Sequence, residues 1–183
     1  QGQGREDIAM NDQQFEKNIG RICRNDKEGL REIYEDYCPL IYSVVREILG
    51  NREDAEDVTS DFFIRIWDIA DTYRTGRGHR AWLITIARNL AIDYLRKRKK
   101  ESLTAEIPDY LQAGESSCEE RLCQKLGLEQ ALMTLKEEER QIVNLKIMGE
   151  LTFREIASVL KKPQGTVAWY YRTAIRKLKE VQL

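Results

Sequence analysis

The chain has 183 residues, of which 42% are apolar and 33% charged, and its formal net charge is −1. This length suits one domain or two small ones, with enough apolar residues for a buried core. The sequence contains neither a run of about 18 apolar residues nor a secretory h-region, so we expect a cytoplasmic protein without a membrane span. Four cysteines without a pairing pattern and one histidine favour neither disulfides nor a zinc site, and we expect no metal and no cofactor.

The near-zero net charge hides two oppositely charged blocks. The charged residues of 71–100 are mostly basic, with the run Arg96–Lys100 at the end of this block, whereas the charged residues of 101–129 are mostly acidic. Local blocks of this kind say more about partners than the whole-chain charge does.

The first half of the chain predicts helices. Apolar residues at i, i+4 and i+7 indicate a helix over residues 11–31 with a break at Asn25-Asp26. A long amphipathic helix, or two abutting ones, is expected over residues 30–49, with Tyr34 among the inward-facing side chains and Gly50 at the end.

An acidic helix is predicted over residues 51–67. Asp54, Asp57 and Asp61 share one of its faces, while Val58, Phe62 and Ile66 mark the buried one. The carboxylates fit either a solvated acidic cluster or a patch that docks a partner. Catalysis or metal binding is disfavoured, because no histidine or further acidic cluster accompanies them.

Residues 73–80 predict an arginine-rich loop, and residues 81–100 a strong helix with aromatic residues and a basic end. Arginines that grip the backbone and aromatics that stack on bases are typical of proteins that hold single-stranded DNA. The alternative is that Trp82 and Tyr94 belong to the core and the basic run is merely solvated.

The end of the chain predicts a helix-turn-helix over residues 151–179. Thr152 and Glu155 form a capping box, and Pro163 and Gly165 lie in the expected turn, 161–165. In the second helix, Val167, Tyr171, Ala174 and Leu178 face inward, and the polar, basic face opposite them includes Lys177. Such a face suits the major groove, although a helical hairpin that only packs is the alternative.

We therefore predict an all-α fold of two small helical domains. Residues 1–12 are assigned to a disordered N-terminus or cloning remnant, 13–100 to an N-terminal helical bundle, 101–121 to a flexible acidic linker, and 122–183 to a four-helix C-terminal domain with the helix-turn-helix.

With both ends considered, the chain resembles the sigma-70 family of bacterial RNA polymerase sigma factors, specifically the extracytoplasmic-function (ECF) group. DAEDVTSDFFIRIW (54–67) is similar to the family's helix that binds core polymerase. AWLITIARNLAIDYLRKRKK (81–100) is similar to its minus-10 and melting segment, and residues 135–180 to its minus-35 domain.

The resemblance implies three sets of contact residues. Core polymerase would contact Asp54, Asp57, Ser60, Asp61, Phe63 and Trp67. The minus-10 element and the melted strand would contact Tyr73, Arg74, Arg77, His79, Arg80, Trp82, Arg88, Asn89, Arg96 and Lys97. The minus-35 element would contact Gln164, Thr166, Ala168, Trp169, Tyr170, Arg172, Thr173 and Arg176.

This sequence departs from the family pattern at three of its positions. Ser60 replaces a common glutamine of the docking helix, and Tyr170 and Thr173 stand where basic residues are frequent. Fewer guanidinium groups mean fewer bidentate guanine contacts, which puts the minus-35 preference in question.

The resemblance implies a promoter-specificity subunit of RNA polymerase that melts DNA and is not an enzyme. Its partners would be core RNA polymerase, promoter DNA as duplex and as melted strand, and an anti-sigma factor. Two alternatives stay open on the residues alone: a helix-turn-helix regulator that binds operators without polymerase, and a helical adaptor that binds proteins only.

Overall fold

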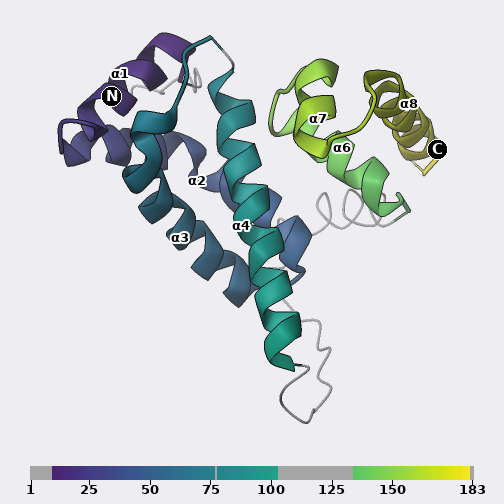
Figure 1. Ribbon diagram of the computed structural model, residues 1–183. Coiled ribbons are helices and arrows are strands. Elements are labelled where there is room, and N and C mark those ends of the chain that lie inside the picture. Colours follow the sequence, from purple (N-terminus) through teal and green to yellow (C-terminus); the bar gives the residue numbers. More distant parts are fainter. Residues whose placement is uncertain (1–9, 77, 103–133, 182–183) are drawn as a thin grey trace, which may run out of the picture.

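The computed structural model describes residues 10–76, 78–102 and 134–181, in which all regular structure is helical (Figure 1). The elements are α1 (Asp12–Ile22), α2 (Lys27–Leu49), α3 (Arg52–Ile69), the 3-10 turn η1 (Ala70–Thr72), α4 (His79–Ser102), α6 (Glu137–Ile147), α7 (Phe153–Leu160) and α8 (Gln164–Val181). The predicted all-α class is confirmed. Most of the predicted linker, residues 122–133 of the predicted four-helix C-terminal domain and the first nine residues lie outside the described part.

Side-chain caps fix where the helices begin, as the sequence predicted for the helix-turn-helix. The Thr152 hydroxyl accepts the Glu155 amide at 3.2 Å, and the Glu155 carboxylate accepts the Thr152 amide at 2.8 Å. Asn11 and Gln14 form the same reciprocal box at the start of α1. Each box satisfies amides that have no partner in the first turn. Gly50 ends α2 with φ 77°, a conformation that glycine adopts without strain.

Helices α1 to α4 form the first layer of the molecule and share one apolar core. Phe15, Ile33, Phe62 and Leu83, one from each of these helices, are fully buried. Figure 1 shows α4 passing along α2 and α3 and extending beyond them at its C-terminal end. The projecting end is the basic run, which leaves its side chains exposed.

One side chain of α2 lies on the opposite side from the one predicted. Tyr34 was expected to face the core but is 49% exposed. Its ring packs edge-on against Phe63 of α3 at 4.8 Å between centroids. Apolar residues occupy more of the surface of α2 than the part that packs on the core. The spacing of these residues therefore did not distinguish the core-facing side from the exposed side.

Helices α6, α7 and α8 form the described part of the second domain. Val167 and Ala174 of α8 are buried, as predicted. Lys177, assigned to the outer face, instead bridges to Glu139 of α6 at 2.7 and 2.8 Å. Glu139 is only 2% exposed, so its buried charge draws the lysine inward.

The predicted turn between α7 and α8 is shorter than expected. Lys161 takes a left-handed conformation with φ 52°, and α8 already begins at Gln164, so Gly165 belongs to the helix. Pro163 precedes the first helical residue, where its missing amide costs nothing.

The two groups of helices are in contact. Helix α6 packs against α2, and α7 packs against α4. Buried residues of both groups, such as Ile84 and Leu145, belong to one apolar cluster. Within the described residues, no helix is long and apolar enough to cross a membrane.

Candidate protein- and DNA-binding surfaces

Three of the predicted polymerase contacts lie together on the outer face of α3. Asp57, Ser60 and Asp61 are exposed and follow the helical spacing i, i+3 and i+4. Ile64, the next residue on this face, is 64% exposed. Ile64 was not among the predicted contacts, although its position at i+7 from Asp57 was a usable signal. An apolar side chain among carboxylates provides apolar surface that a protein partner can bury.

Asp54, assigned to the same contact set, is instead held by α4. Its carboxylate accepts the Tyr94 hydroxyl at 2.6 Å and pairs with Arg98 and Asn51. Partial burial opposes ionisation, but the bonds from Tyr94 and Asn51 and the charge of Arg98 outweigh it and lower the pKa of the carboxyl. In this structure Asp54 joins α3 to α4.

This network predicts an acid-sensitive first domain. The folded state lowers the pKa of Asp54, so the ionised Asp54 carboxylate stabilises the fold. This contribution to the free energy of unfolding is complete above the unfolded-state pKa of about 3.9 and is lost as the pH falls through the folded-state pKa. The free energy of unfolding, measured by urea titration between about pH 5 and pH 3, should therefore fall less steeply in Asp54→Asn than in the parent protein. Tyr94→Phe, which removes one donor, should show an intermediate slope; identical slopes in all three proteins contradict this account.

Two further predicted polymerase contacts lie beneath this face. Phe63 is 5% exposed and packs against Phe62 at 5.0 Å as well as against Tyr34. Trp67 is partly buried against the core. In this structure both side chains pack between α3 and the core, and so they hold α3 in place.

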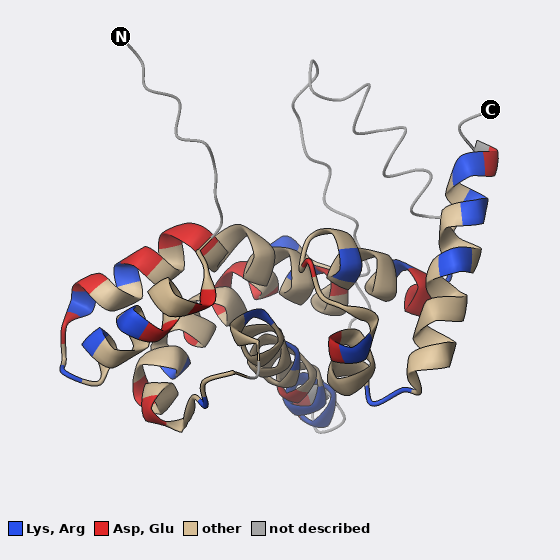
Figure 2. Ribbon diagram, turned by 90° about the horizontal axis from the view of Figure 1, so that it is seen from above, with Lys and Arg blue, Asp and Glu red and all other residues tan. Residues whose placement is uncertain are grey.

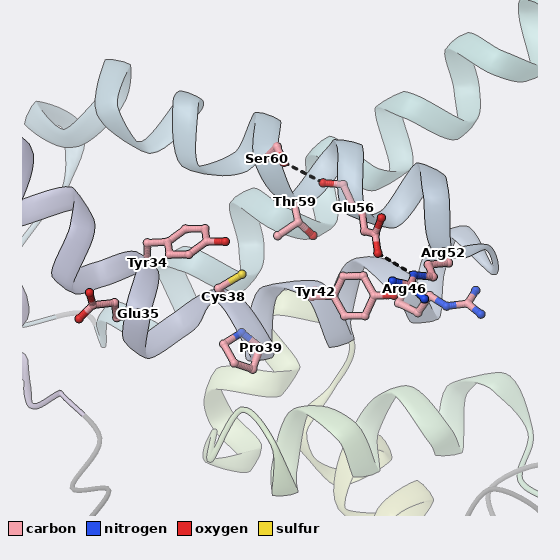
Figure 3. A pocket seen from close by; sticks show the side chains of 10 residues that line it. All are labelled: Tyr34, Glu35, Cys38, Pro39, Tyr42, Arg46, Arg52, Glu56, Thr59 and Ser60. Carbon is pink, nitrogen blue, oxygen red and sulfur yellow. Dashed lines mark hydrogen bonds and ion pairs between the residues drawn. The ribbon is translucent and has the colours of Figure 1, made fainter. Parts of the chain in front are cut away.

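A groove of about 910 Å³ lies between α2 and α3, next to the acidic face (Figure 3). Tyr34, Cys38 and Tyr42 line it from α2, and Ser60 lies at its α3 side. The three α2 residues recur at i, i+4 and i+8, so they form a second apolar stripe, of which only Tyr34 was predicted, and on the core-facing side.

Two predicted DNA contacts of the arginine-rich loop region are buried. Tyr73 is 8% and His79 5% exposed. His79 bonds to Asp12 of α1 and Tyr37 of α2 through its two ring nitrogens, and it stacks on Phe15 at 4.7 Å. Both ring nitrogens are therefore engaged within the protein, and His79 holds the first turn of α4 to α1 and α2.

The remaining residues of this set divide into exposed and covered groups. Arg74, Asn89, Arg96 and Lys97 are exposed, whereas Arg80, Trp82 and Arg88 are partly buried. Arg77 lies outside the described residues. Figure 2, which views α4 nearly along its axis, shows Lys and Arg concentrated toward its C-terminal end.

Helix α8 presents the predicted minus-35 residues outward to different degrees. Gln164, Trp169, Arg172 and Arg176 are exposed, while Thr166, Ala168, Tyr170 and Thr173 are half-buried. Trp169 and Tyr170 contact each other edge-on at 5.0 Å. This face therefore offers an aromatic pair in the N-terminal half of α8 and arginines at its middle and in its C-terminal half. Side chains of both kinds can reach bases and sugars from a helix in the major groove.

No set of three or more His, Cys, Asp or Glu side chains in the described ranges is arranged to hold a metal ion. Cys23 is exposed and Cys38 half-buried, and both are free thiols. The other two cysteines fall between residues 103 and 133, outside the described part.

Comparison with known proteins shows the family of the chain. The family model "Sigma-70 region 2" matches residues 33–101, and "Sigma-70, region 4" matches residues 131–180. The ECF RNA polymerase sigma factor SigW of Bacillus subtilis is 31% identical over 165 residues, which cover 84% of this chain and 88% of SigW. This chain belongs to the ECF sigma factors. The family identity that the sequence suggested is thus confirmed.

Two solved structures share the fold of this sigma factor. CnrH in complex with the cytosolic domain of CnrY superposes with a TM-score of 0.64 at 18% identity, covering 92% of this chain and 97% of CnrH. The sigma factor RpoE of Bartonella quintana, in complex with the anti-sigma factor NepR, gives 0.62 at 22% identity, covering 85% and 97% of the two chains. The α1 helix precedes the region 2 match, yet its Phe15 lies in the centre of the same core.

Proposed function

We propose that this sigma factor binds core RNA polymerase through the outer face of α3 and holds the melted minus-10 strand along α4. In the same assignment, α8 reads the minus-35 duplex. The observation that supports this proposal most directly is the order of three unlike surfaces in one chain: the acidic face with Ile64, the basic end of α4 and the exposed face of α8. As an ECF sigma factor the chain is a promoter-recognition subunit, and the family's proteins are not enzymes.

The chemistry of α4 suits a single strand better than a duplex. Arg96 and Lys97 are exposed at the projecting basic end, where the helix dipole also favours positive side chains. Strand binding of this kind combines backbone contacts by basic groups with base stacking on aromatic rings. Trp82, partly exposed one turn into α4, is the aromatic residue in a position to stack.

Arg176→Ala tests the assignment of α8. Arg176 is exposed on the C-terminal half of the helix, and its side chain makes no hydrogen bond or ion pair within the described residues, so its loss should leave the fold intact. If it meets a phosphate, affinity for duplex carrying the upstream element should fall and the slope of log affinity against log salt should drop by about one. Fluorescence anisotropy over a salt series measures both, with Glu180→Ala as the control; an unchanged slope contradicts the phosphate contact.

We also propose an anti-sigma factor as a partner, because both solved relatives, CnrH and RpoE, were obtained in complexes. The acidic α3 face and the groove beside it offer the exposed apolar and charged groups that such a partner needs. Since its proposed targets are polymerase and promoter DNA, we place the protein in the cytoplasm.

Run-off transcription on fragmented genomic DNA, with core polymerase in the presence and absence of this protein, tests the proposed function. New transcripts whose start sites share two spaced upstream elements are the expected result. Duplex binding without any new start, and without binding to core polymerase, would favour the stand-alone regulator instead.

A further inference from the structure

The groove between α2 and α3 holds a free thiol beside a buried hydroxyl group. Cys38 of α2 is half-buried, and Figure 3 shows its sulfur pointing toward α3, between Tyr34 and Thr59. Thr59 lines the groove from α3 and is 5% exposed, yet its hydroxyl has no hydrogen-bond partner among the described residues. Buried hydroxyls normally have a partner, so an unpaired one in a groove indicates where a ligand group would bond.

Arg46 is the charged residue of this groove that has no ion pair within the described part of the chain. It is half-buried and lines the groove two helical turns along α2 from the thiol. The other charged residues are paired, Arg52 with Glu56 at 2.7 Å. Glu35 pairs with Arg31 at 3.1 Å. A half-buried guanidinium without a carboxylate can bind an anion, because its planar group donates two parallel hydrogen bonds to a carboxylate.

The spacing of the thiol and the guanidinium suits a small, peptide-like ligand. Cys38, Tyr42 and Arg46 recur at i, i+4 and i+8, so the two ends of this row lie about 12 Å apart along α2. An extended molecule of three residues spans about 10 Å, and the arginine side chain can reach the rest of the way. The groove volume of about 910 Å³ is within the range of small-molecule sites, about 300–1,000 Å³.

We propose that Cys38 is a modification site, at which a low-molecular-weight thiol that carries a carboxylate forms a mixed disulfide. In the adduct the carboxylate pairs with Arg46, and a polar group of the modifier bonds to the Thr59 hydroxyl. The Cys38 thiolate attacks one sulfur of the modifier's disulfide, so a new S–S bond forms as the original one breaks. The other half leaves as a thiolate and takes up the proton that Cys38 released, so Cys38 is oxidised and the leaving half is reduced.

The adduct would block polymerase binding, and this consequence rests on the proposed function of α3. Ser60 lines the groove and also lies on the outer face of α3, with Asp57 and Asp61. A modifier bound in the groove therefore lies next to the surface proposed for core polymerase. Because reducing thiols break the mixed disulfide, the block is reversible.

Proteins with a single thiol test the chemistry. One retains Cys38 and carries Cys23→Ser, Cys118→Ser and Cys123→Ser; its matched control retains Cys23, which is exposed at the end of α1. Each protein is mixed with glutathione disulfide, which carries carboxylates, or with the neutral bis(2-hydroxyethyl) disulfide. Intact-protein mass spectrometry over time gives the rate of modification with each reagent.

The charge of Arg46 should control which reagent Cys38 prefers. Arg46→Gln should slow the reaction of Cys38 with glutathione disulfide at least about threefold and leave its reaction with the neutral reagent unchanged. It should change neither rate at Cys23. Arg65→Gln, which removes an exposed charge of α3 outside the groove, should have no effect. A Cys38 that does not react, or an Arg46→Gln variant that slows neither reagent or both equally, overturns the proposal.

The Thr59 hydroxyl should stabilise the adduct once it has formed. At a fixed ratio of glutathione to its disulfide, Thr59→Val should lower the equilibrium constant for modification of Cys38 about threefold. The melting temperature of the unmodified protein should not fall, because the hydroxyl has no bond to lose among the described residues. An unchanged equilibrium constant removes Thr59 from the site.

Binding to core polymerase tests the proposed block. The glutathione adduct at Cys38 should bind at least about tenfold more weakly than the unmodified protein, and dithiothreitol should restore binding. The adduct at Cys23 should bind as the unmodified protein does. Equal binding with and without the Cys38 adduct overturns the block. Failure of the unmodified protein to bind polymerase rejects the proposed function instead, and the rates at Cys38 then decide the modification site alone.

Discussion

Reversing two charges on α3, by Asp57→Lys with Asp61→Lys, should abolish transcription while leaving the fold and duplex binding intact. Both side chains are exposed on one helix face, and no hydrogen bond or ion pair to them is found in the described structure. Truncating one partner of a desolvated charge pair at an interface costs about 2–5 kcal/mol, and reversal adds repulsion. Each single reversal should weaken binding to core polymerase by at least about tenfold, and the pair by more.

Binding of labelled protein to core polymerase measures this effect. Asp71→Lys is the matched control, because Asp71 is also exposed but lies in η1, outside α3. Ile64→Ala tests the apolar part of the same face and should act through dissociation more than association. Undiminished affinity in the double variant would remove α3 from the polymerase interface.

Phe15→Ala should destabilise the first domain more than any surface change. The Phe15 ring is fully buried and contacts the rings of Tyr37, Tyr73, His79 and Trp82, which belong to α2, the loop after η1 and α4. Removing a buried phenylalanine side chain costs about 3–5 kcal/mol. Total domain stability is often about 5–15 kcal/mol, so this loss is a large share of it.

Urea unfolding followed by circular dichroism measures the loss, and Phe15→Leu, which keeps most of the volume, should lose much less. Tyr73, at the start of the arginine-rich loop, and His79, in the first turn of α4, pack on this ring. Strand binding should therefore weaken in Phe15→Ala even where the protein remains folded. A loss below about 1 kcal/mol would mean that α1 contributes little to the core.

Local signals accounted for most of the fold. Helix ends depend on hydrogen bonds between residues at most four positions apart, which is why the sequence predicted them closely. Examples are the helix starts at Thr152 and Asn51 and the helix end at Gly50. Tyr34 was placed wrongly because α2 carries two apolar stripes, and periodicity does not say which of them the other helices cover.

The site was harder to predict because its geometry comes from distant pairings. His79 lies in an arginine-rich sequence segment that is typical of a DNA-contacting loop. In the structure it bonds to Asp12, 67 positions away, and to Tyr37, 42 positions away, and is buried. Arg80 pairs with Glu150 of the second domain, and Glu47 of α2 bonds to Asn144 of α6 across 97 positions. No spacing rule connects residues so far apart, so the contact between the domains had no signal in the sequence.

The buried pair of Glu139 and Lys177 has a consequence for redesign. Because it fixes the inner side of α8 to α6, together with Val167 and Ala174, the packing of the helix does not depend on its outward residues. Promoter preference should therefore be transplantable: outward positions such as Trp169 and Arg172 can take the residues of another sigma factor while the domain keeps its shape. For a library that seeks new promoter specificities, this means varying the outer face of α8 and leaving Lys177 unchanged.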